Sequence, residues 1–261
     1  MIQIGCCGLT EHYPLIKEMG YDYIELSGTQ VMSLSDEEFR SFLKIYDPET
    51  LPCRGFNAYC PGQYPIVGPG SGSEKVKEYA EKICIRGALL GVKTIGIGAP
   101  AARKLPEGYD LQKADREMEE FLKMICDIAE AYHITILLEA VHKYMCNYMN
   151  YTKEAVDMVK KLGLPNLAMV LDYYHAMVMG EDLHDFGYAM PLVKHLHIST
   201  DLENHFRGFV KKEDVTQLKS LLAEATAAGY EGGISIEADF SKLASDGAAC
   251  LGYMREAACE A

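Results

Sequence analysis

Four residues that can bind a metal ion end four successive apolar stretches in the second half of the chain. They are Glu139 after ITILL, Asp172 after AMVL, His197 in KHLH and Glu237 after GISI. A carboxylate or an imidazole in this position is informative because such a group is costly to bury without a partner. Three carboxylates and one imidazole suit one divalent cation such as Mn²⁺, Co²⁺, Mg²⁺ or Zn²⁺. We therefore predict one metal site built from these four residues.

The same donor set defines the chemistry that the site would carry. An ion that accepts six ligands and takes four from the protein keeps two positions for a substrate carbonyl and an adjacent hydroxyl. As a Lewis acid, the ion would stabilise the enediolate that forms when a proton leaves the neighbouring carbon. Proton transfer of this kind interconverts isomers or epimers of hydroxylated carbonyl compounds. The expected partner is therefore a small sugar or a substrate derived from a polyol.

Eight short apolar or β-branched segments alternate with segments of helical period and would position these residues. We predict strands at Ile2–Cys6, Tyr23–Leu26, Cys53–Ala58, Thr94–Gly98, Thr135–Glu139, Ala168–Asp172, His195–Ser199 and Gly233–Glu237. Eight strands that alternate with helices favour a (β/α)8 TIM barrel of the α/β class. The length of 261 residues fits one such barrel, so we expect a single domain over residues 1–261. The four candidate ligands then share the rim where enzymes of this fold bind substrate.

Helix signals occupy several of the segments between the predicted strands. Two S-x-x-E sequences, at 35–38 and 71–74, fit the capping box that begins a helix. Thr152 and Gly163 fit the start and the end of another helix. Apolar residues recur on one face of Asp115–Tyr132, which predicts the longest outer helix.

Charge and composition exclude several classes of protein. The net charge of −13 disfavours extended binding to nucleic acid or to anionic membranes. No apolar stretch reaches the length of a membrane span, and the N-terminus lacks the basic segment of a signal peptide. The nine cysteines form no C-x-x-C pair and fit reduced thiols. We expect a cytoplasmic protein without nucleic-acid or membrane partners, and self-association into a homo-oligomer stays open.

The candidate ligands, with DYYH at 172–175 and HLH at 195–197, resemble the xylose isomerase-like TIM barrel superfamily. Within it, the chain is most similar to the sugar phosphate isomerase/epimerase branch that includes the ketose 3-epimerases. The resemblance implies that Glu139 and Glu237 both bind the metal and exchange protons with opposite faces of a substrate carbon. It implies that the other two candidates complete the metal site.

The resemblance also implies substrate contacts and shows one departure. His175 matches a histidine that contacts a substrate oxygen, and Arg207 is a looser match to an arginine that binds substrate. The epimerases carry a further glutamate six residues after the first ligand, where this chain has Met145. A metal-dependent sugar or sugar-phosphate isomerase or epimerase is therefore the leading expectation, and ketose 3-epimerisation is one option within it.

Other polar residues near the predicted strand ends have two possible roles each. Asn57 and Glu25 either complete the far wall of the pocket or form structural hydrogen bonds. His142 either binds substrate or lies in a solvated loop. His195 precedes His197 by two residues and therefore points the same way, one layer deeper. We expect His195 to be a hydrogen-bonded core residue rather than a ligand.

Three other functions compete with the isomerase. A lyase, such as an inosose or dehydroshikimate dehydratase, would remove the same proton and then expel a β-hydroxyl group. A metal-dependent abasic-site endonuclease shares the fold, but it needs several metal ions and a DNA-binding face that a charge of −13 disfavours. A non-catalytic carbohydrate-binding pseudoenzyme would keep the fold without turnover.

Overall fold

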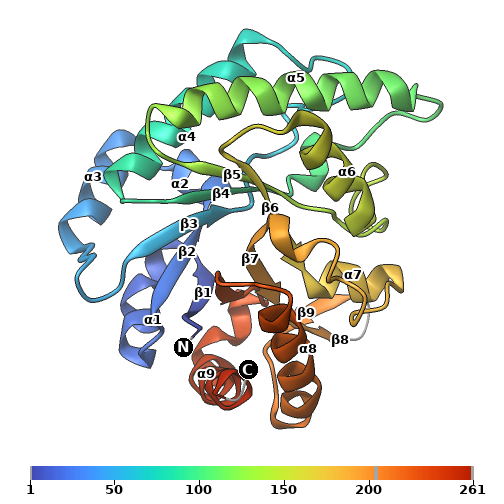
Figure 1. Ribbon diagram of the computed structural model, residues 1–261. Coiled ribbons are helices and arrows are strands. Elements are labelled where there is room, and N and C mark those ends of the chain that lie inside the picture. Colours follow the sequence, from blue (N-terminus) through green and yellow to red (C-terminus); the bar gives the residue numbers. More distant parts are fainter. Residues whose placement is uncertain (1, 203–204, 260–261) are drawn as a thin grey trace.

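Eight parallel strands form a closed barrel in the computed structural model of the chain (Figure 1), which describes residues 2–202 and 205–259. In ring order the strands are β1 (Ile4–Gly8), β2 (Tyr23–Ser27), β3 (Cys53–Asn57), β4 (Thr94–Ile97), β5 (Thr135–Leu138), β6 (Leu167–Asp172), β7 (Val193–Ile198) and β10 (Gly233–Ile236). β10 pairs with β1 and closes the ring. The predicted (β/α)8 TIM barrel is therefore confirmed.

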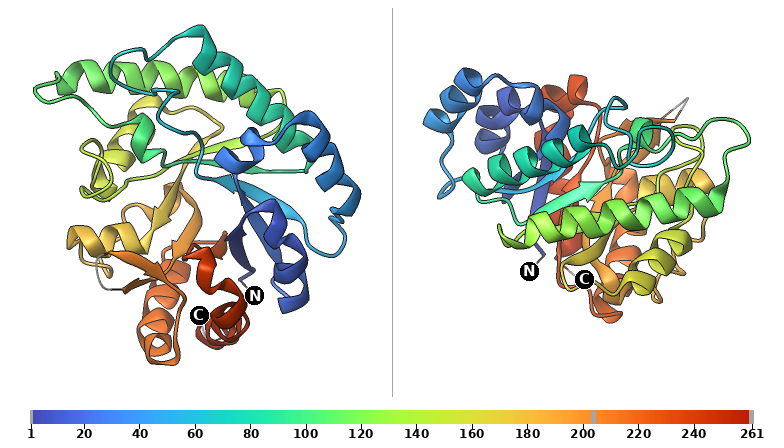
Figure 2. Two further views of the ribbon diagram at one scale, coloured as in Figure 1. Left: turned by 180° about the vertical axis from the view of Figure 1, so that it is seen from behind. Right: turned by 90° about the horizontal axis from the view of Figure 1, so that it is seen from above.

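The helices lie outside the ring of strands, as Figures 1 and 2 show. They are α1 (Tyr13–Met19), α2 (Gly28–Ser33), α3 (Asp36–Ile45), α4 (Glu74–Leu89), α5 (Leu111–Glu130), α6 (Thr152–Leu162), α7 (Tyr173–Met179), α8 (Val215–Ala227) and α9 (Leu243–Ala258). Short 3-10 helices are η1 (Thr10–His12), η2 (Pro100–Ala102), η3 (Met190–Leu192), η4 (Lys212–Asp214) and η5 (Phe240–Lys242). α9 contacts α1 and β1, which joins the last unit to the first. Within the described ranges, no helix has the length and apolar character needed to cross a membrane.

The helix signals at α3 and α5 are confirmed. Ser35 Oγ accepts a hydrogen bond from the Glu38 amide, and the Glu38 carboxylate accepts one from the Ser35 amide. α5 has 20 residues and is the longest helix of the described residues. α6 ends as predicted at Gly163, which has a positive φ of 57°.

Two predicted helix starts are wrong by one or two residues. The N-cap of α4 is Ser73 and not Ser71. Gly72 between them adopts a φ of 69°, a left-handed conformation that keeps Ser71 out of the helix. The N-cap of α6 is Tyr151 and not Thr152. The Thr152 hydroxyl instead donates to Glu181 Oε1, at 3.1 Å.

β1 begins and ends two residues later than predicted, at Ile4–Gly8 instead of Ile2–Cys6. The strand contains two glycines, and one of them is required by packing. A Cβ atom at Gly5 would lie 2.1 Å from the ring of Tyr23, which is fully buried. The other seven barrel strands overlap their predicted ranges.

An antiparallel hairpin, for which we predicted no strands, follows β7. It consists of β8 (Thr200–Leu202) and β9 (Phe206–Gly208), and Arg207 in β9 is in register with Asp201 in β8. The hairpin forms a separate two-stranded sheet outside the barrel ring. It extends the chain beyond the carboxyl end of β7, so its residues can reach the rim of the barrel.

The barrel interior changes from apolar to polar toward the carboxyl ends of the strands. Leu137, Ala168 and Val170 form a small apolar cluster of their own. Because side chains alternate along a strand, Asp172 points the same way as Ala168 and Val170, but at the rim. The sequence of β6 thus places an acidic group directly above an apolar layer.

Candidate metal centre

Four side chains converge at the rim of the barrel, one from each of β5, β6, β7 and β10. Glu139 and Glu237 directly follow β5 and β10, Asp172 ends β6, and His197 lies in β7. One ligand atom of each lies within 4.8 Å of those of the other three. His197 Nδ1 is 3.0 Å from Glu237 Oε2, 3.8 Å from Glu139 Oε1 and 4.0 Å from Asp172 Oδ2. The structure therefore brings together all four predicted ligands.

The junction between β6 and α7 orients Asp172. Its Oδ1 atom accepts hydrogen bonds from the backbone amides of Tyr174, at 2.8 Å, and His175, at 3.2 Å. Asp172 is therefore the N-cap of α7, a role for which aspartate is well suited. Its second oxygen, Oδ2, remains directed at the cluster.

Glu25 in β2 orients His197. Its Oε2 atom lies 2.8 Å from His197 Nε2 and 3.1 Å from His195 Nε2. These separations are those of hydrogen bonds, so Glu25 holds the Nε2 side of His197 while Nδ1 faces the three carboxylates. His195 Nε2 is also 3.0 Å from Ser235 Oγ. The expectation that His195 is a hydrogen-bonded core residue is confirmed. Of the two roles considered for Glu25, the structure shows the one in which it forms structural hydrogen bonds.

Burial and charge act in opposite directions on this cluster. Burial raises the pKa of the Glu139 carboxyl. Burial also acts to raise the pKa of Glu237, but Arg207 and His197 outweigh it and the net pKa is below its ordinary value. Burial acts to lower the pKa of His197, but Glu237 and Glu25 outweigh it and raise that pKa well above its usual range. The buried carboxylates therefore favour positive charge between them.

The residues of the cluster fit a divalent ion. Glu139 Oε1 is buried and has no hydrogen-bond partner, which is costly unless something binds it, and His197 Nδ1 faces the oxygens of all three carboxylates. A Cβ atom at Gly98 would lie 2.2 Å from Glu139 Oε2, so the absence of a side chain there leaves room for this carboxylate. Carboxylate oxygens and an imidazole nitrogen are suitable donors for each of the four predicted ions.

Arg207 reaches the cluster from the β8–β9 hairpin. Its Nη2 atom donates to Asp172 Oδ2 at 2.5 Å and lies 2.9 Å from His175 Nε2. Its Nη1 atom is 3.3 Å from Glu237 Oε2. The predicted substrate residue therefore lies at the site, where its charge is paired with two of the candidate ligands.

Two other predicted substrate residues also border the ligands. Asn57 Nδ2 donates to Glu237 Oε1 at 3.2 Å, and Asn57 Oδ1 is buried without a hydrogen-bond partner. His175 Nε2 is 3.8 Å from Glu139 Oε1, whereas its Nδ1 atom is buried and unpartnered. Burial lowers the pKa of His175 to about 3, so this imidazole is neutral near pH 7.

His142 is buried beside the site, which corrects the alternative of a solvated loop. The side chain is only 2% exposed, and neither ring nitrogen has a hydrogen-bond partner. Its ring centroid lies 4.9 Å from that of His175 and 5.7 Å from that of Tyr174. Lys143, the next residue, is exposed. His142 therefore joins the wall of the site on the side of His175.

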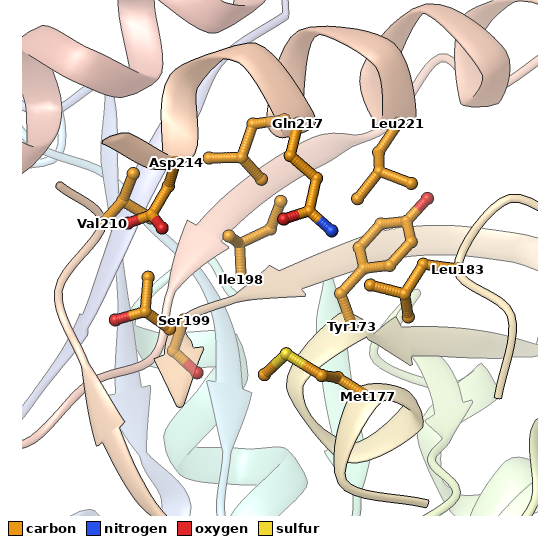
Figure 3. A pocket seen from close by; sticks show the side chains of 11 residues that line it. Tyr173, Met177, Leu183, Ile198, Ser199, Val210, Asp214, Gln217 and Leu221 are labelled. Carbon is orange, nitrogen blue, oxygen red and sulfur yellow. The ribbon is translucent and has the colours of Figure 1, made fainter. Parts of the chain in front are cut away.

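A cavity of about 230 Å³ lies behind β7 and between α7 and α8 (Figure 3). Tyr173 and Met177 line it from α7, and Gln217 and Leu221 from α8. Ile198 also lines it, and because Ile198 alternates with His197 it faces away from the barrel interior. The cavity contains none of the four candidate ligands, so we place the chemistry at the rim cluster.

Comparisons with known proteins show where this arrangement belongs. The model of the family described as xylose isomerase-like TIM barrel matches residues 14–254. Inosose isomerase of Bacillus velezensis is 25% identical over 211 residues, which are 79% of this chain and 72% of that protein. The 3-dehydro-D-guloside 4-epimerase of Escherichia coli is 22% identical over 244 residues, or 88% and 86% of the two chains.

A solved structure adds a metal to the comparison. The crystal structure of the IOLI protein with a binding zinc atom has a TM-score of 0.73 at 19% identity, and the match covers 99% of each chain. That protein has the same fold as this one. The two curated relatives are named as an isomerase and an epimerase, which confirms the expectation of an enzyme of this type. This chain belongs to the xylose isomerase-like TIM barrel family.

Proposed function

We propose that the protein is a metal-dependent isomerase or epimerase of a small sugar or sugar phosphate. The observation that carries the proposal is the presence of Glu139 and Glu237 in one cluster, although β6 and β7 separate their strands in the ring. Two carboxylates that approach from different sides can remove a proton from one face of a carbon and return one to the other face. A divalent ion in the cluster would polarise the substrate carbonyl and so acidify the neighbouring C–H bond.

The surroundings of the two glutamates suit opposite roles in proton transfer. Burial raises the pKa of Glu139, which favours the protonated acid. Burial opposes the ionisation of Glu237 too, but Arg207 and His197 lower its pKa overall, which favours the ionised base. Carboxyl groups whose surroundings separate their pKa values in this way serve as acid and base in many enzymes. The two roles exchange when the reaction runs in reverse.

The polar atoms around the cluster favour a substrate with several hydroxyl groups. Asn57 Oδ1, His175 Nδ1 and both ring nitrogens of His142 are buried without hydrogen-bond partners. Unpartnered polar atoms in a buried site are costly, and hydroxyl groups can satisfy them because each hydroxyl both donates and accepts. Arg207 adds a guanidinium group that can bind a substrate oxygen next to the carboxylates. The residues Asn57, His142, His175 and Arg207 would therefore orient the substrate.

The names of the relatives narrow the compounds to be tried first. They include an inosose, which is a cyclic keto-polyol, and a dehydro-guloside, which is a keto-glycoside. We therefore include both classes with free and phosphorylated ketoses in the panel of candidate substrates.

Proton exchange with solvent tests the proposal. The protein is loaded with Mn²⁺ or Co²⁺ for turnover, and each compound is incubated with it in D₂O and analysed by NMR and mass spectrometry. We expect at least one compound to gain deuterium next to its carbonyl and to form an isomer or epimer. The Glu237→Gln variant should lose this exchange.

Two results would contradict the proposed reaction. One is the absence of exchange from every compound although the protein carries its metal. The other is a product that has lost water and shows the absorbance of an enone, which would assign a dehydratase that uses the same proton removal.

A further inference from the structure

Arg103 is a fully buried arginine that has no carboxylate partner among the described residues. It follows η2 in the loop between β4 and α5, and its side chain is 0% exposed. Its Nη1 atom donates to the backbone carbonyl of Glu139 at 2.9 Å, whereas its Nε and Nη2 atoms have no hydrogen-bond partner. A buried cation without an ionic partner destabilises a fold, so the position of this residue requires an explanation other than stability.

A second buried arginine shows what a purely structural role looks like in this chain. Arg86 is 3% exposed and belongs to α4, one of the helices outside the ring of strands (Figure 1). It donates to the carbonyls of Val31, at 2.6 Å, and Leu34, at 2.9 Å, and to Asp36 Oδ1 at 2.8 Å. Arg86 is thus paired, and it connects α4 to both α2 and α3. The guanidinium group of Arg103 instead donates to the backbone carbonyl of a candidate metal ligand at 2.9 Å and makes a longer contact of 3.8 Å with Met149 Sδ.

The loop that carries Arg103 meets Glu139 in a second way. At the start of this loop, Gly98 leaves space for the carboxylate, because a Cβ atom there would lie 2.2 Å from Glu139 Oε2. Farther along, the Leu105 amide donates to Asn147 Oδ1 at 2.8 Å, and Asn147 Nδ2 donates to the Leu105 carbonyl at 3.0 Å. The loop after β4 is thereby fastened to the loop after β5, which begins at Glu139.

We propose that Arg103 is a positioning residue for Glu139. Its hydrogen bond fixes the carbonyl of Glu139 and therefore the conformation of the backbone at the end of β5. That conformation sets the direction in which the Glu139 side chain leaves the chain, over Gly98 and toward the other ligands. The consequence for metal binding rests on the proposed function, whereas the effect on the backbone does not.

Hydrogen exchange measured by mass spectrometry tests the effect on the backbone in the metal-free protein. Arg103→Met removes the charge and all side-chain donors at similar length, and Arg103→Lys keeps the charge and a donating ammonium group on a flexible side chain. We expect faster amide exchange in residues 137–142 of Arg103→Met, and a partial return to the wild-type rate in Arg103→Lys. The Arg86→Met variant is the matched control, because it also loses a buried arginine, and its exchange in this segment should equal that of the wild type.

Calorimetric titration with Mn²⁺ alone tests the consequence for the site. Loss of a group that orients a metal ligand typically lowers metal affinity by about 10–100-fold. We expect a loss at the low end of that range, so that Arg103→Met binds Mn²⁺ about tenfold more weakly than the wild type. Arg86→Met should lower thermal stability but retain the wild-type affinity. Arg103→Gln replaces the methionine variant if the latter does not fold.

Unchanged exchange of residues 137–142 in Arg103→Met would overturn the inference. Equal acceleration in Arg86→Met would also overturn it, since the effect would then be a general loosening of the fold. If the wild type binds no Mn²⁺, the proposed function fails, and the exchange experiment still decides the role of Arg103. Equal Mn²⁺ affinity in the wild type and Arg103→Met would show that Arg103 does not position Glu139 for metal binding, and would overturn that part of the inference.

Discussion

The two halves of the barrel contribute differently to the candidate metal centre. The ligand half, which consists of β5, β6, β7 and β10, supplies all four candidate ligands. The support half, which consists of β1 to β4 and their loops, supplies groups that hold those ligands. Glu25 binds His197 and Asn57 binds Glu237. Asp172, by contrast, is oriented by the amides of Tyr174 and His175 in its own half. The comparison teaches that His197 and Glu237 depend on groups from a distant part of the sequence, and that such groups leave a different signal from the ligands themselves.

The largest effect is expected from the ligand half. Glu139→Gln removes an ionisable oxygen from both proton transfer and metal binding. We expect the rate of solvent proton exchange at saturating metal to fall by about 10²–10⁴-fold, the usual contribution of a general acid or base. Glu38→Gln in α3 is the control, because it makes the same change in an exposed helix cap. A wild-type rate in Glu139→Gln would contradict the catalytic role.

The support half should act on metal affinity more than on the chemical step. Glu25→Gln weakens the hydrogen bond that holds Nε2 of His197. Loss of such a partner typically costs about 10–100-fold in metal affinity, and calorimetry with Mn²⁺ should show a decrease in that range. The rate at saturating metal should fall less than in Glu139→Gln. If Glu25→Gln reduced the rate but not the affinity, the division between the two halves would be wrong.

Metal affinity should increase with pH. The pKa of Glu139 is raised by burial, and that of His197 is raised because Glu237 and Glu25 outweigh burial. Both groups therefore retain protons in the metal-free protein at pH values where free side chains would have lost them. An ion must displace those protons, so affinity should rise by up to about tenfold per pH unit for each proton released. Titrations in buffers of different ionisation enthalpy would measure the release, and an affinity independent of pH would contradict this account.

The smallest effect is expected at Gly98. Gly98→Ala places a Cβ atom 2.2 Å from Glu139 Oε2 unless the carboxylate moves. Overpacking of this kind typically costs about 1–3 kcal/mol, and thermal unfolding should report it together with a modest loss of Mn²⁺ affinity. Gly252→Ala in α9 is the control, since no atom outside its own helix lies within 4 Å of its Cβ position. A stable Gly98→Ala variant with wild-type affinity would show that Glu139 does not need this space.

The fold and the ligand half could be predicted because their signals are local. An apolar run that ends in Glu139 or Asp172 is visible within six residues, and eight short apolar or β-branched runs, with or without such an ending, define the barrel. The contacts of the support half are not local. Glu25 and His197 lie 172 positions apart, so their hydrogen bond follows only from ring closure. Arg103 has no sequence signal as a partner of Glu139, because an arginine in a loop is usually exposed.

The hairpin of β8 and β9 was missed for a different reason. Its two strands have three residues each, which is too short for a clear alternating pattern. The sequence resemblance selected Arg207, but only the hairpin shows how this residue reaches Asp172 and Glu237. Short strands that pair only with each other are therefore the part of this site that the sequence indicates least.

The central claim is that Glu139, Asp172, His197 and Glu237 bind one divalent ion, and metal analysis of the folded protein tests it most directly. The comparison is between the wild type and Asp172→Asn, because asparagine still caps α7 but lacks the charge. We predict one bound Mn²⁺ or Zn²⁺ per wild-type chain after dialysis, and almost none in Asp172→Asn with the same circular dichroism spectrum. A wild-type protein without stoichiometric metal, or a variant that binds the ion equally well, would contradict the account.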